Sequence, residues 1–382
     1  PAYHTDMIYT DETGPEVEIE LPNPETFTSC PSQAISMRVQ DTRGVDPSTI
    51  VLEVQGTEYT MEDPELNYIT PALMFSPAEP FEDGDTVEVV LLAAEDSLGN
   101  ELEEPVDWEF YVDLSPPTAD MIFPEPNSIT TCSDSTIELL LQDTGSGINY
   151  DAVELGLNDS PISSDNWEVR GDTIIVSPPI VLSEGEVTVN VFYVEDVAQY
   201  CEPNSAEGME FSFTVDLTGP VCEPQFPLPG QLVDTLNPNI TLRITDNYTA
   251  IDTSSIVVAI NEDTLSYGSS GLDFLEGYLR IDTYEAGLIF EPGESIFVQL
   301  ISATDSPSSC EPNPLSTPCG YQLTILGDIG RLLECVGAPA ETVYLPLTFE
   351  SIEGTHLTSL SFEINSNPEV AEPIDVVTAD GL

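Results

Sequence analysis

The sequence predicts an all-β chain of tandem antiparallel β-sandwiches, and three observations support that prediction. Three short segments containing Asp and Pro, at residues 10–15, 112–117 and 215–220, resemble one another, and their aspartates lie 102 and 103 residues apart. Apolar and polar residues alternate before each segment, as in a strand that runs into a Pro-stiffened linker. No stretch has the period of an amphipathic helix. A repeat of about 100 residues is the size of one small sandwich domain.

The repeat divides the chain into five parts. Residues 1–13 are expected to hold the last strand of a preceding domain, because Tyr3–Thr10 stands where Trp108–Val112 stands in the next repeat. Such a strand would expose unpaired backbone groups, so we expect it to pair with another chain or with a further segment of its own chain. Complete sandwiches are predicted at 14–114, 115–217 and 218–327, followed by an incomplete domain at 328–382.

Alternating runs define the expected strands of each sandwich. They are 17–21, 35–39, 50–54, 73–75, 87–92 and 108–112 in the first, 121–123, 137–141, 153–157, 167–169, 174–176, 187–194 and 209–215 in the second, and 240–244, 256–260, 272–281, 288–290, 296–301 and 321–326 in the third. Short strands of this number, separated by turn residues, are typical of Greek-key sandwiches of immunoglobulin type.

Three kinds of motif carry a resemblance to a known family. The segments at 41–50 (DTRGVDPSTI), 143–148 (DTGSGI) and 246–252 (DNYTAID) resemble the D-x-G-S-G-I-D-P-S-T loop of bacterial Ig-like repeat domains. Residues 94–100 (AEDSLGN) and 303–305 (ATD) are similar to the A-x-D-x-x-G-N turn of those domains, and the linkers resemble their V-D-T-T-A-P junction. The resemblance covers about residues 1–325 and implies surface or adhesive proteins. The second and third units lack the Gly-Asn ending of the turn.

The C-terminal part departs from the repeat. Its apolar run at 340–349, a turn near Gly354, and the runs at 360–364 and 367–370 resemble the opening strands of a cohesin-like sandwich. Cohesins bind dockerins, so the resemblance implies a docking role as one possible function.

Charge restricts the partners. The chain has 70 acidic residues against 6 basic ones, none of them Lys, and a formal net charge of −64. Such a field disfavours nucleic acid and anionic membranes and attracts cations. An acidic surface adapted to high salt is the alternative explanation. Disorder is not expected, because 40% of the residues are apolar and fall in alternating runs.

Signatures of catalysis are scarce. The two histidines, His4 and His356, lie in an expected terminal strand and near a turn, which disfavours a Ser-His or Cys-His mechanism. The absence of Lys excludes a Schiff base, and no Gly-rich phosphate loop is present. We therefore expect a protein that is not an enzyme.

Aspartates recur in register at the strand ends. Each unit carries one Asp in the linker, one after the second strand and one after the sixth, and in an immunoglobulin-type sandwich these lie at one pole. Several carboxylates converging with backbone carbonyls form a site for a hard cation, and Ca²⁺ takes six to eight such oxygens. The alternative is that Asp is simply favoured in turns. The predicted calcium ligands are Asp11, Asp41, Asp46, Asp96 and Asn100 in the first site, Asp113, Asp143, Asp151 and Asp196 in the second, and Asp216, Asp246, Asp252 and Asp305 in the third.

The seven cysteines are interpreted across the repeat boundaries. Cys30 and Cys132 are equivalent positions before the second strand, and Cys201 and Cys310 are equivalent positions after the sixth. These positions lie at opposite poles of one sandwich, so pairing within a sandwich is excluded by the 4.4–6.8 Å between Cα atoms that a disulfide needs. The predicted pairs are Cys30–Cys201, Cys132–Cys310 and Cys222–Cys319, with Cys335 left for another partner or as a free thiol. The alternative is that all seven are reduced and buried.

Together these features predict an extracellular structural or adhesive rod, or a filament subunit, stiffened at its junctions by calcium and disulfides. Its expected partners are copies of itself or other surface proteins. Two alternatives remain open at this point: a binding module that docks a partner or holds a glycan, and the spacer region of a large secreted enzyme.

Overall fold

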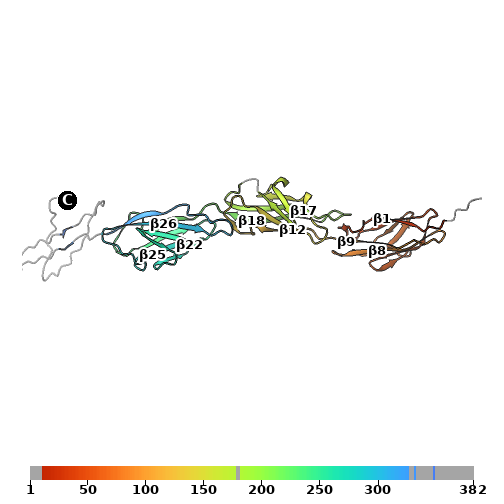
Figure 1. Ribbon diagram of the computed structural model, residues 1–382, viewed down its shortest axis with the longest axis horizontal. Coiled ribbons are helices and arrows are strands. Elements are labelled where there is room, and N and C mark those ends of the chain that lie inside the picture. The colour runs from red at the N-terminus through yellow and green to blue at the C-terminus, as the bar shows by residue number, and fades with distance from the viewer. Residues whose placement is uncertain (1–10, 178–180, 327–330, 333–346, 349–382) are drawn as a thin grey trace, which may run out of the picture. The chain divides into compact units, whose positions relative to one another are not determined.

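The computed structural model describes residues 11–177, 181–326, 331–332 and 347–348 (Figure 1). The expected strand Tyr3–Thr10 and, apart from the short strands β28 (Arg331–Leu332) and β29 (Leu347–Thr348), the C-terminal part 328–382 lie outside the described residues. Within the described residues the chain is all-β, with two short 3₁₀ turns, η1 (Tyr150–Ala152) and η2 (Ser164–Asn166). No helix among these residues is long and apolar enough to cross a membrane.

The strands form antiparallel β-sandwiches of immunoglobulin type, each made of a four-stranded and a five-stranded sheet. In the first sandwich the sheets have the orders β1-β3-β7-β6 and β2-β9-β8-β4-β5. The strands are β1 (Glu16–Leu21), β2 (Phe27–Thr28), β3 (Ile35–Gln40), β4 (Val45–Val54), β5 (Thr57–Tyr59), β6 (Leu66–Ile69), β7 (Ala72–Phe75), β8 (Thr86–Asp96) and β9 (Val106–Val112).

The second and third sandwiches repeat this topology. Their sheets are β10-β12-β16-β15 with β11-β18-β17-β13-β14, and β19-β21-β25-β24 with β20-β27-β26-β22-β23. The strands are β10 (Thr118–Phe123), β11 (Ile129–Thr130), β12 (Ile137–Gln142), β13 (Glu154–Leu157), β14 (Ser160–Pro161), β15 (Trp167–Arg170), β16 (Thr173–Val176), β17 (Gly185–Glu195), β18 (Ser205–Val215), β19 (Val221–Phe226), β20 (Leu232–Val233), β21 (Asn239–Thr245), β22 (Ile251–Ile260), β23 (Asp263–Ser266), β24 (Leu272–Leu275), β25 (Tyr278–Asp282), β26 (Ser295–Asp305) and β27 (Gly320–Ile325).

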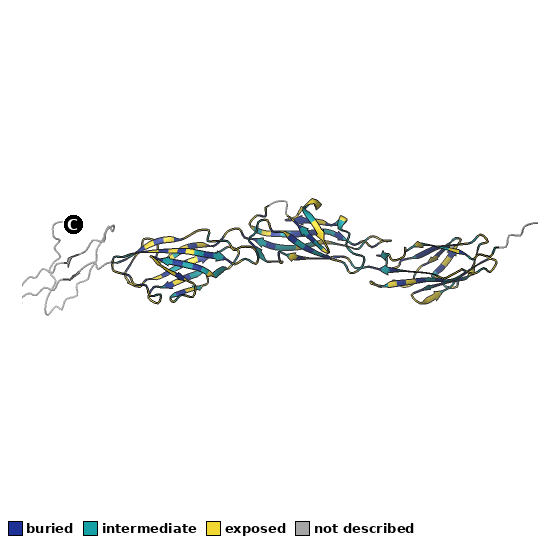
Figure 2. Cartoon of the chain, viewed as in Figure 1, coloured by how far each residue is buried: buried dark blue, intermediate teal, exposed yellow. Residues whose placement is uncertain are grey.

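Each sandwich has its own apolar core between its two sheets. The fully buried residues include Ile50 and Phe110 in the first, Leu139 and Phe213 in the second, and Ile240 in the third. Buried and exposed residues alternate along the strands, as the period of two requires (Figure 2). This alternation confirms the all-β fold class predicted from the sequence.

Two expected strands of the third sandwich differ in the structure. The run predicted as one strand at 272–281 is broken into β24 and β25, because Glu276 and Gly277 adopt positive φ angles of 51° and 81° and form a turn. The predicted strand at 288–290 is not a strand, although Leu288 and Phe290 are buried. Alternating burial therefore did not by itself imply a hydrogen-bonded ladder at this position.

The chain divides into two compact units. The first comprises the chain through Gly219 together with the loop segments Asp246–Ala250 and Asp305–Asn313. The second comprises the described residues of the remaining segments, Pro220–Thr245, Ile251–Thr304 and Pro314–Leu382. Asp216, Asp246 and Asp305, which were predicted to share one site, therefore all belong to the first unit.

Candidate cation sites and covalent links

The structure brings three sets of aspartates together, and we call them the first, second and third Asp triads. In each triad one carboxylate oxygen per residue lies within 4.8 Å of the others. One member of each triad comes from the linker before the sandwich. The second follows β3, β12 or β21, and the third lies at the end of β8, β17 or β26. The triads are Asp11, Asp41 and Asp96; Asp113, Asp143 and Asp196; and Asp216, Asp246 and Asp305.

An asparagine closes each triad in the same way. The backbone N–H of Asn100 donates to Asp96 Oδ1 at 2.8 Å, and its Nδ2 donates to Asp96 Oδ2 at 2.8 Å and to the carbonyl oxygen of Asp11 at 3.3 Å. Asn204 makes the equivalent bonds to Asp196 and to the carbonyl of Asp113, at 3.0, 2.6 and 2.8 Å. Each asparagine therefore joins the sixth-strand carboxylate to the linker backbone.

Asn313 repeats the arrangement in the third triad. Its backbone N–H and Nδ2 donate to the two carboxylate oxygens of Asp305 at 2.6 and 2.7 Å, and Nδ2 also donates to the Asp216 carbonyl at 2.9 Å. Asn100 was among the predicted ligands, whereas Asn204 and Asn313 were not, because they lie eight residues after their aspartate instead of four. The signal that would have found them is the sequence Cys-Glu-Pro-Asn, which occurs at both 201–204 and 310–313.

Three predicted ligands are not brought into the triads. Asp46 Oδ1 accepts hydrogen bonds from the backbone N–H and the hydroxyl of Ser48, at 3.0 and 2.7 Å. Asp252 Oδ1 accepts the same pair of bonds from Ser254, at 2.9 and 2.7 Å. Asp151 is exposed in η1. For Asp46 and Asp252, the carboxylate stabilises its own turn, as Asp commonly does.

The second and third triads are more deeply buried than the first. Asp113, Asp196, Asp216 and Asp305 are at most 1% exposed. Asp143 Oδ2 accepts backbone N–H bonds from Gly145 and Gly147 at 3.0 and 2.8 Å, whereas its Oδ1 is buried without a hydrogen-bond donor. Asp216 Oδ2 is likewise buried and without a donor.

Buried carboxylate oxygens without donors are costly unless a cation or a proton compensates them. The two donor-free oxygens belong to the second and third triads. An oxygen-lined, anionic and desolvated group of this kind suits a hard cation. The second triad also requires glycine at position 145. A Cβ there would lie 2.3 Å from Asp113 Cγ, so only glycine fits beside that carboxylate.

The pKa values separate the triads in the same way. Burial, followed by the nearby Asp246 charge, raises the pKa of Asp216 from 3.8 to about 6. Burial also raises the pKa of Asp196 and Asp305, although hydrogen bonds from Asn204 and Asn313 oppose the shift. In the first triad, hydrogen bonds from Thr42 and Thr13 lower the pKa of Asp11.

The metal-free chain should therefore become less stable as the pH rises from about 4 to above 6. Between these pH values a carboxyl group with a raised folded pKa binds more protons in the folded state than in the unfolded state. Its contribution to the free energy of unfolding is therefore fully present below the unfolded pKa of 3.8. That contribution is lost as the pH rises through the folded pKa of about 6. Chemical denaturation in chelator at pH 5 and pH 7 measures this. Because general charge repulsion has the same sign, the test is whether Asp216→Asn reduces the dependence; an unchanged dependence would contradict the assignment to Asp216.

Three disulfides link the chain, and they are the pairs that the sequence register predicts. Cys30–Cys201, Cys132–Cys310 and Cys222–Cys319 have Cα–Cα distances of 5.4, 5.9 and 5.4 Å. Cys30 precedes β3, and Cys201 follows β17, so the first bond joins two successive sandwiches within the first unit. Cys222 and Cys319 are both buried in the core of the third sandwich.

No family model and no curated protein matches the chain. Among solved structures, one of a 1.5-MDa bacterial ice-binding adhesin is 12% identical, with 83% of this chain and 100% of that chain covered and a TM-score of 0.33. The I9–I11 tandem of titin is 10% identical, with 82% and 99% covered and a TM-score of 0.23. Fibronectin(III)-like modules of Clostridium thermocellum CbhA are 12% identical, with 52% and 94% covered and a TM-score of 0.27. At these identities the likeness concerns the fold alone.

Proposed function

We propose that the chain is a structural or adhesive segment of an extracellular protein, in which calcium and disulfides fix successive Ig-like sandwiches to one another. The observation that carries the proposal is the threefold recurrence of one arrangement: an Asp triad closed by an asparagine that also binds the linker carbonyl. Each triad contains a linker Asp, so a bound ion would hold the linker to two loops of the sandwich that follows it.

Calcium fits the donor set better than zinc or copper does. All candidate ligands are oxygens, and the groups contain no His or Cys, which Zn²⁺ and Cu²⁺ prefer. Asp143 Oδ1 and Asp216 Oδ2 are buried and accept no hydrogen bond, so their negative charge is uncompensated. A bound divalent cation would compensate it. The residues that would hold the ion are the triad carboxylates.

The proposed role is mechanical and not enzymatic. Three disulfides favour an oxidising compartment outside the cell. With a net charge of −64, nucleic acid and anionic membranes are poor partners, and we propose copies of the chain or other surface proteins instead. The part that resembles a cohesin, 328–382, lies outside the described residues apart from β28 and β29.

Small-angle scattering with calcium and with chelator tests the proposal. We expect the maximum dimension and the flexibility of the intact chain to change on chelation, because metal-free triads repel internally and release the linkers. Asp151→Asn, which removes an equally negative but exposed side chain, is the matched control and should respond as the unsubstituted chain does. Identical scattering in calcium and in chelator would contradict the proposed role.

A further inference from the structure

The second sandwich differs from the other two on the side formed by β13, β14 and β15. Among the described residues it alone carries 3₁₀ turns, η1 before β13 and η2 before β15. In the first and third sandwiches the position of η1 belongs to the long strands β4 and β22, where Asp46 and Asp252 accept hydrogen bonds from the serine two residues later. The second sandwich has the sequence Asn-Tyr-Asp at 149–151 instead, so this local Asp-Ser turn is absent there.

A hollow of about 510 Å³ lies on this side of the second sandwich. Residues of η1, η2, β13, β14, β15 and β17 line it. Three of them are aromatic, Tyr150, Trp167 and Phe192, and all three are partly exposed. Tyr150 and Trp167 also pack against the core of the sandwich, which holds their rings in place. An open depression with ordered aromatic walls is suited to binding a ligand.

Trp167 stands where the other sandwiches have a buried aliphatic residue. It begins β15, whereas the residues that begin the equivalent strands β6 and β24 are Leu66 and Leu272. Both leucines are buried, while Trp167 is partly exposed at the hollow. The aromatic ring at this position is therefore a feature of the second sandwich and not a requirement of the shared fold.

Gly156 makes room for the ring of Phe192. A Cβ on Gly156 would lie 2.5 Å from Phe192 Cε2, so the ring lies against the backbone of β13. Phe192 is four residues before Asp196 of the second triad, and the same position relative to the other triads holds Leu92 and Ile301. A second aromatic residue of the hollow is thus absent from the equivalent places in the repeat.

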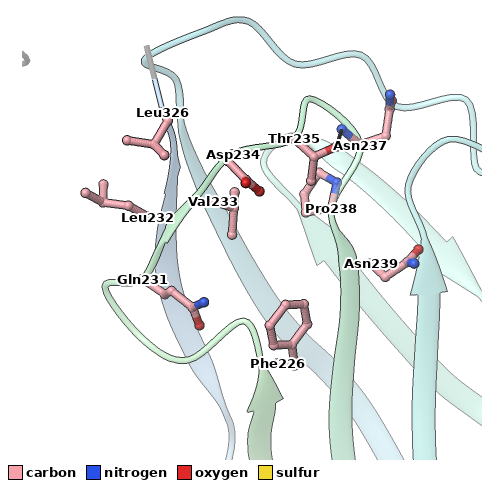
Figure 3. Close-up of a pocket in the computed structure, with 10 residues that line it drawn as sticks. All are labelled: Phe226, Gln231, Leu232, Val233, Asp234, Thr235, Asn237, Pro238, Asn239 and Leu326. Atoms are coloured by element: carbon pink, nitrogen blue, oxygen red, sulfur yellow. Dashed lines mark hydrogen bonds between the residues drawn. The ribbon is translucent and has the colours of Figure 1, made fainter. Parts of the chain in front are cut away.

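The hollow beside β20 of the third sandwich has a different lining (Figure 3). Its volume is about 590 Å³, but among the described residues that line it one is aromatic, Phe226, and one is acidic, Asp234. The hollow of the second sandwich gathers three aromatic and two acidic residues in a smaller volume.

The two acidic residues of this hollow are Asp151 and Glu154. Their side chains are exposed and, within the described part of the chain, form no hydrogen bond or ion pair. The described residues of the lining include no Lys, Arg or His. Aromatic faces and carboxylates both attract cations. A neutral sugar would need donors too, and the hydroxyl of Tyr150 already donates to the Gly171 carbonyl at 3.3 Å.

We propose that this hollow binds an arginine side chain exposed on another surface protein. A guanidinium is planar, stacks on aromatic faces, and has five donors and no acceptor, which complements a lining of rings and carboxylates. A second copy of the chain is a poor partner here, because two chains that each carry a charge of −64 repel one another. The inference rests on the adhesive role proposed above, but no triad residue lines the hollow.

The fluorescence of Trp167 tests the proposal on the full chain. The sequence has two Trp residues, and Trp108→Phe leaves Trp167 as the single emitter. Trp108 lies in the core of the first sandwich and its Nε1 has no hydrogen-bond partner, so phenylalanine removes no bond. A capped Gly-Arg-Gly peptide is compared with the same peptide carrying citrulline, which has the shape of arginine without its charge.

We expect the arginine peptide to bind at least about tenfold more tightly than the citrulline peptide, because only the first carries a cation. Equal binding of the citrulline peptide would overturn the proposal. So would equal binding of a lysine peptide, or a response to maltotriose in place of the arginine peptide. The scattering test described above involves no peptide, so failure of the arginine site and failure of the calcium sites are distinguishable.

Substitutions in the hollow locate the contact. Asp151→Asn combined with Glu154→Gln removes both carboxylates and should weaken binding of the arginine peptide by about tenfold or more. Phe192→Leu, which introduces the residue found at position 92, should weaken it by about threefold. Asp165→Asn is the matched control, because Asp165 is an exposed acid of η2 that does not line the hollow. A loss in the control equal to that of the double variant would contradict a specific site, since it would show attraction by the acidic surface in general.

Discussion

Chelating calcium should lower the midpoint of thermal unfolding of the first unit by about 10 °C or more. An ion that binds only the folded state contributes about 2.7 kcal/mol per site when its free concentration is 100 times Kd, and in one sandwich of about 100 residues each kcal/mol moves the midpoint by about 4–8 °C. The second and third triads should account for most of the change, because their carboxylates are desolvated and include donor-free oxygens. Calorimetry of the intact chain in calcium and in chelator measures the shift.

Two substitutions make this prediction sharper, because their effect should change sign with the metal. In Asp143→Asn the new side-chain oxygen can still accept from Gly145 and Gly147, while the amide nitrogen replaces the donor-free Oδ1. In chelator the variant should be more stable than the unsubstituted chain by about 1 kcal/mol, since a repulsive oxygen becomes a donor. In calcium it should be less stable, because a ligand is lost.

Asp216→Asn should behave in the same way, and Asp151→Asn is the control that should change little in either buffer. A loss of stability in both buffers for Asp143→Asn and Asp216→Asn would show that these carboxylates serve the fold without a metal. The same sign in calcium and in chelator is thus the result that contradicts the calcium sites.

The first triad is expected to bind calcium most weakly. Arg43 Nε lies 3.7 Å from Asp11 Oδ2, and Thr42 donates to the same oxygen at 2.7 Å. A guanidinium and a hydroxyl already satisfy part of the charge that an ion would otherwise neutralise. The first sandwich should therefore respond to chelator less than the second.

Much of the candidate site could be predicted because the repeat keeps strand length and Asp position together. The aspartates of the linker, of the second expected strand and of the sixth converge at all three sandwiches, since strand ends at one pole of a sandwich are neighbours in space. The parts that could not be predicted depend on loops. Asp46 and Asp252 have the same residue type and a neighbouring position, but a serine two residues later captures each carboxylate locally.

Short strands were also missed for a physical reason. β2, β11 and β20 have only two residues each, which is too short for alternation to be recognised, and they pair in parallel with the last strand of their sandwich. Two of them, β2 and β11, are the edges with which the loops Asp196–Asn204 and Asp305–Asn313 pair. The sequence predicted the disulfides that lock the loops, but not the strand pairing that orients them.

Removing the disulfide Cys222–Cys319 should destabilise the third sandwich by about 4 kcal/mol. Both cysteines are buried in its core and close a loop with a sequence separation of 97 residues, and a crosslink of about that length restricts the unfolded state by about 4.7 kcal/mol in the chain-entropy model. We expect amide hydrogen exchange of β21 and β26 in Cys222→Ala/Cys319→Ala to be about a thousandfold faster, while β8 and β9 keep their protection.

Cys30→Ala/Cys201→Ala is the matched variant and should act differently. Its cysteines belong to two sandwiches that each have a separate core, so the strands of both cores should keep their protection within about tenfold. Faster exchange should be confined to the amides that join the loop Asp196–Asn204 to β2, at Gln199 and Ser29. Equal loss of core protection in the two variants would contradict this division, because it would mean that the inter-sandwich bond supports the cores as much as the bond within the third sandwich does.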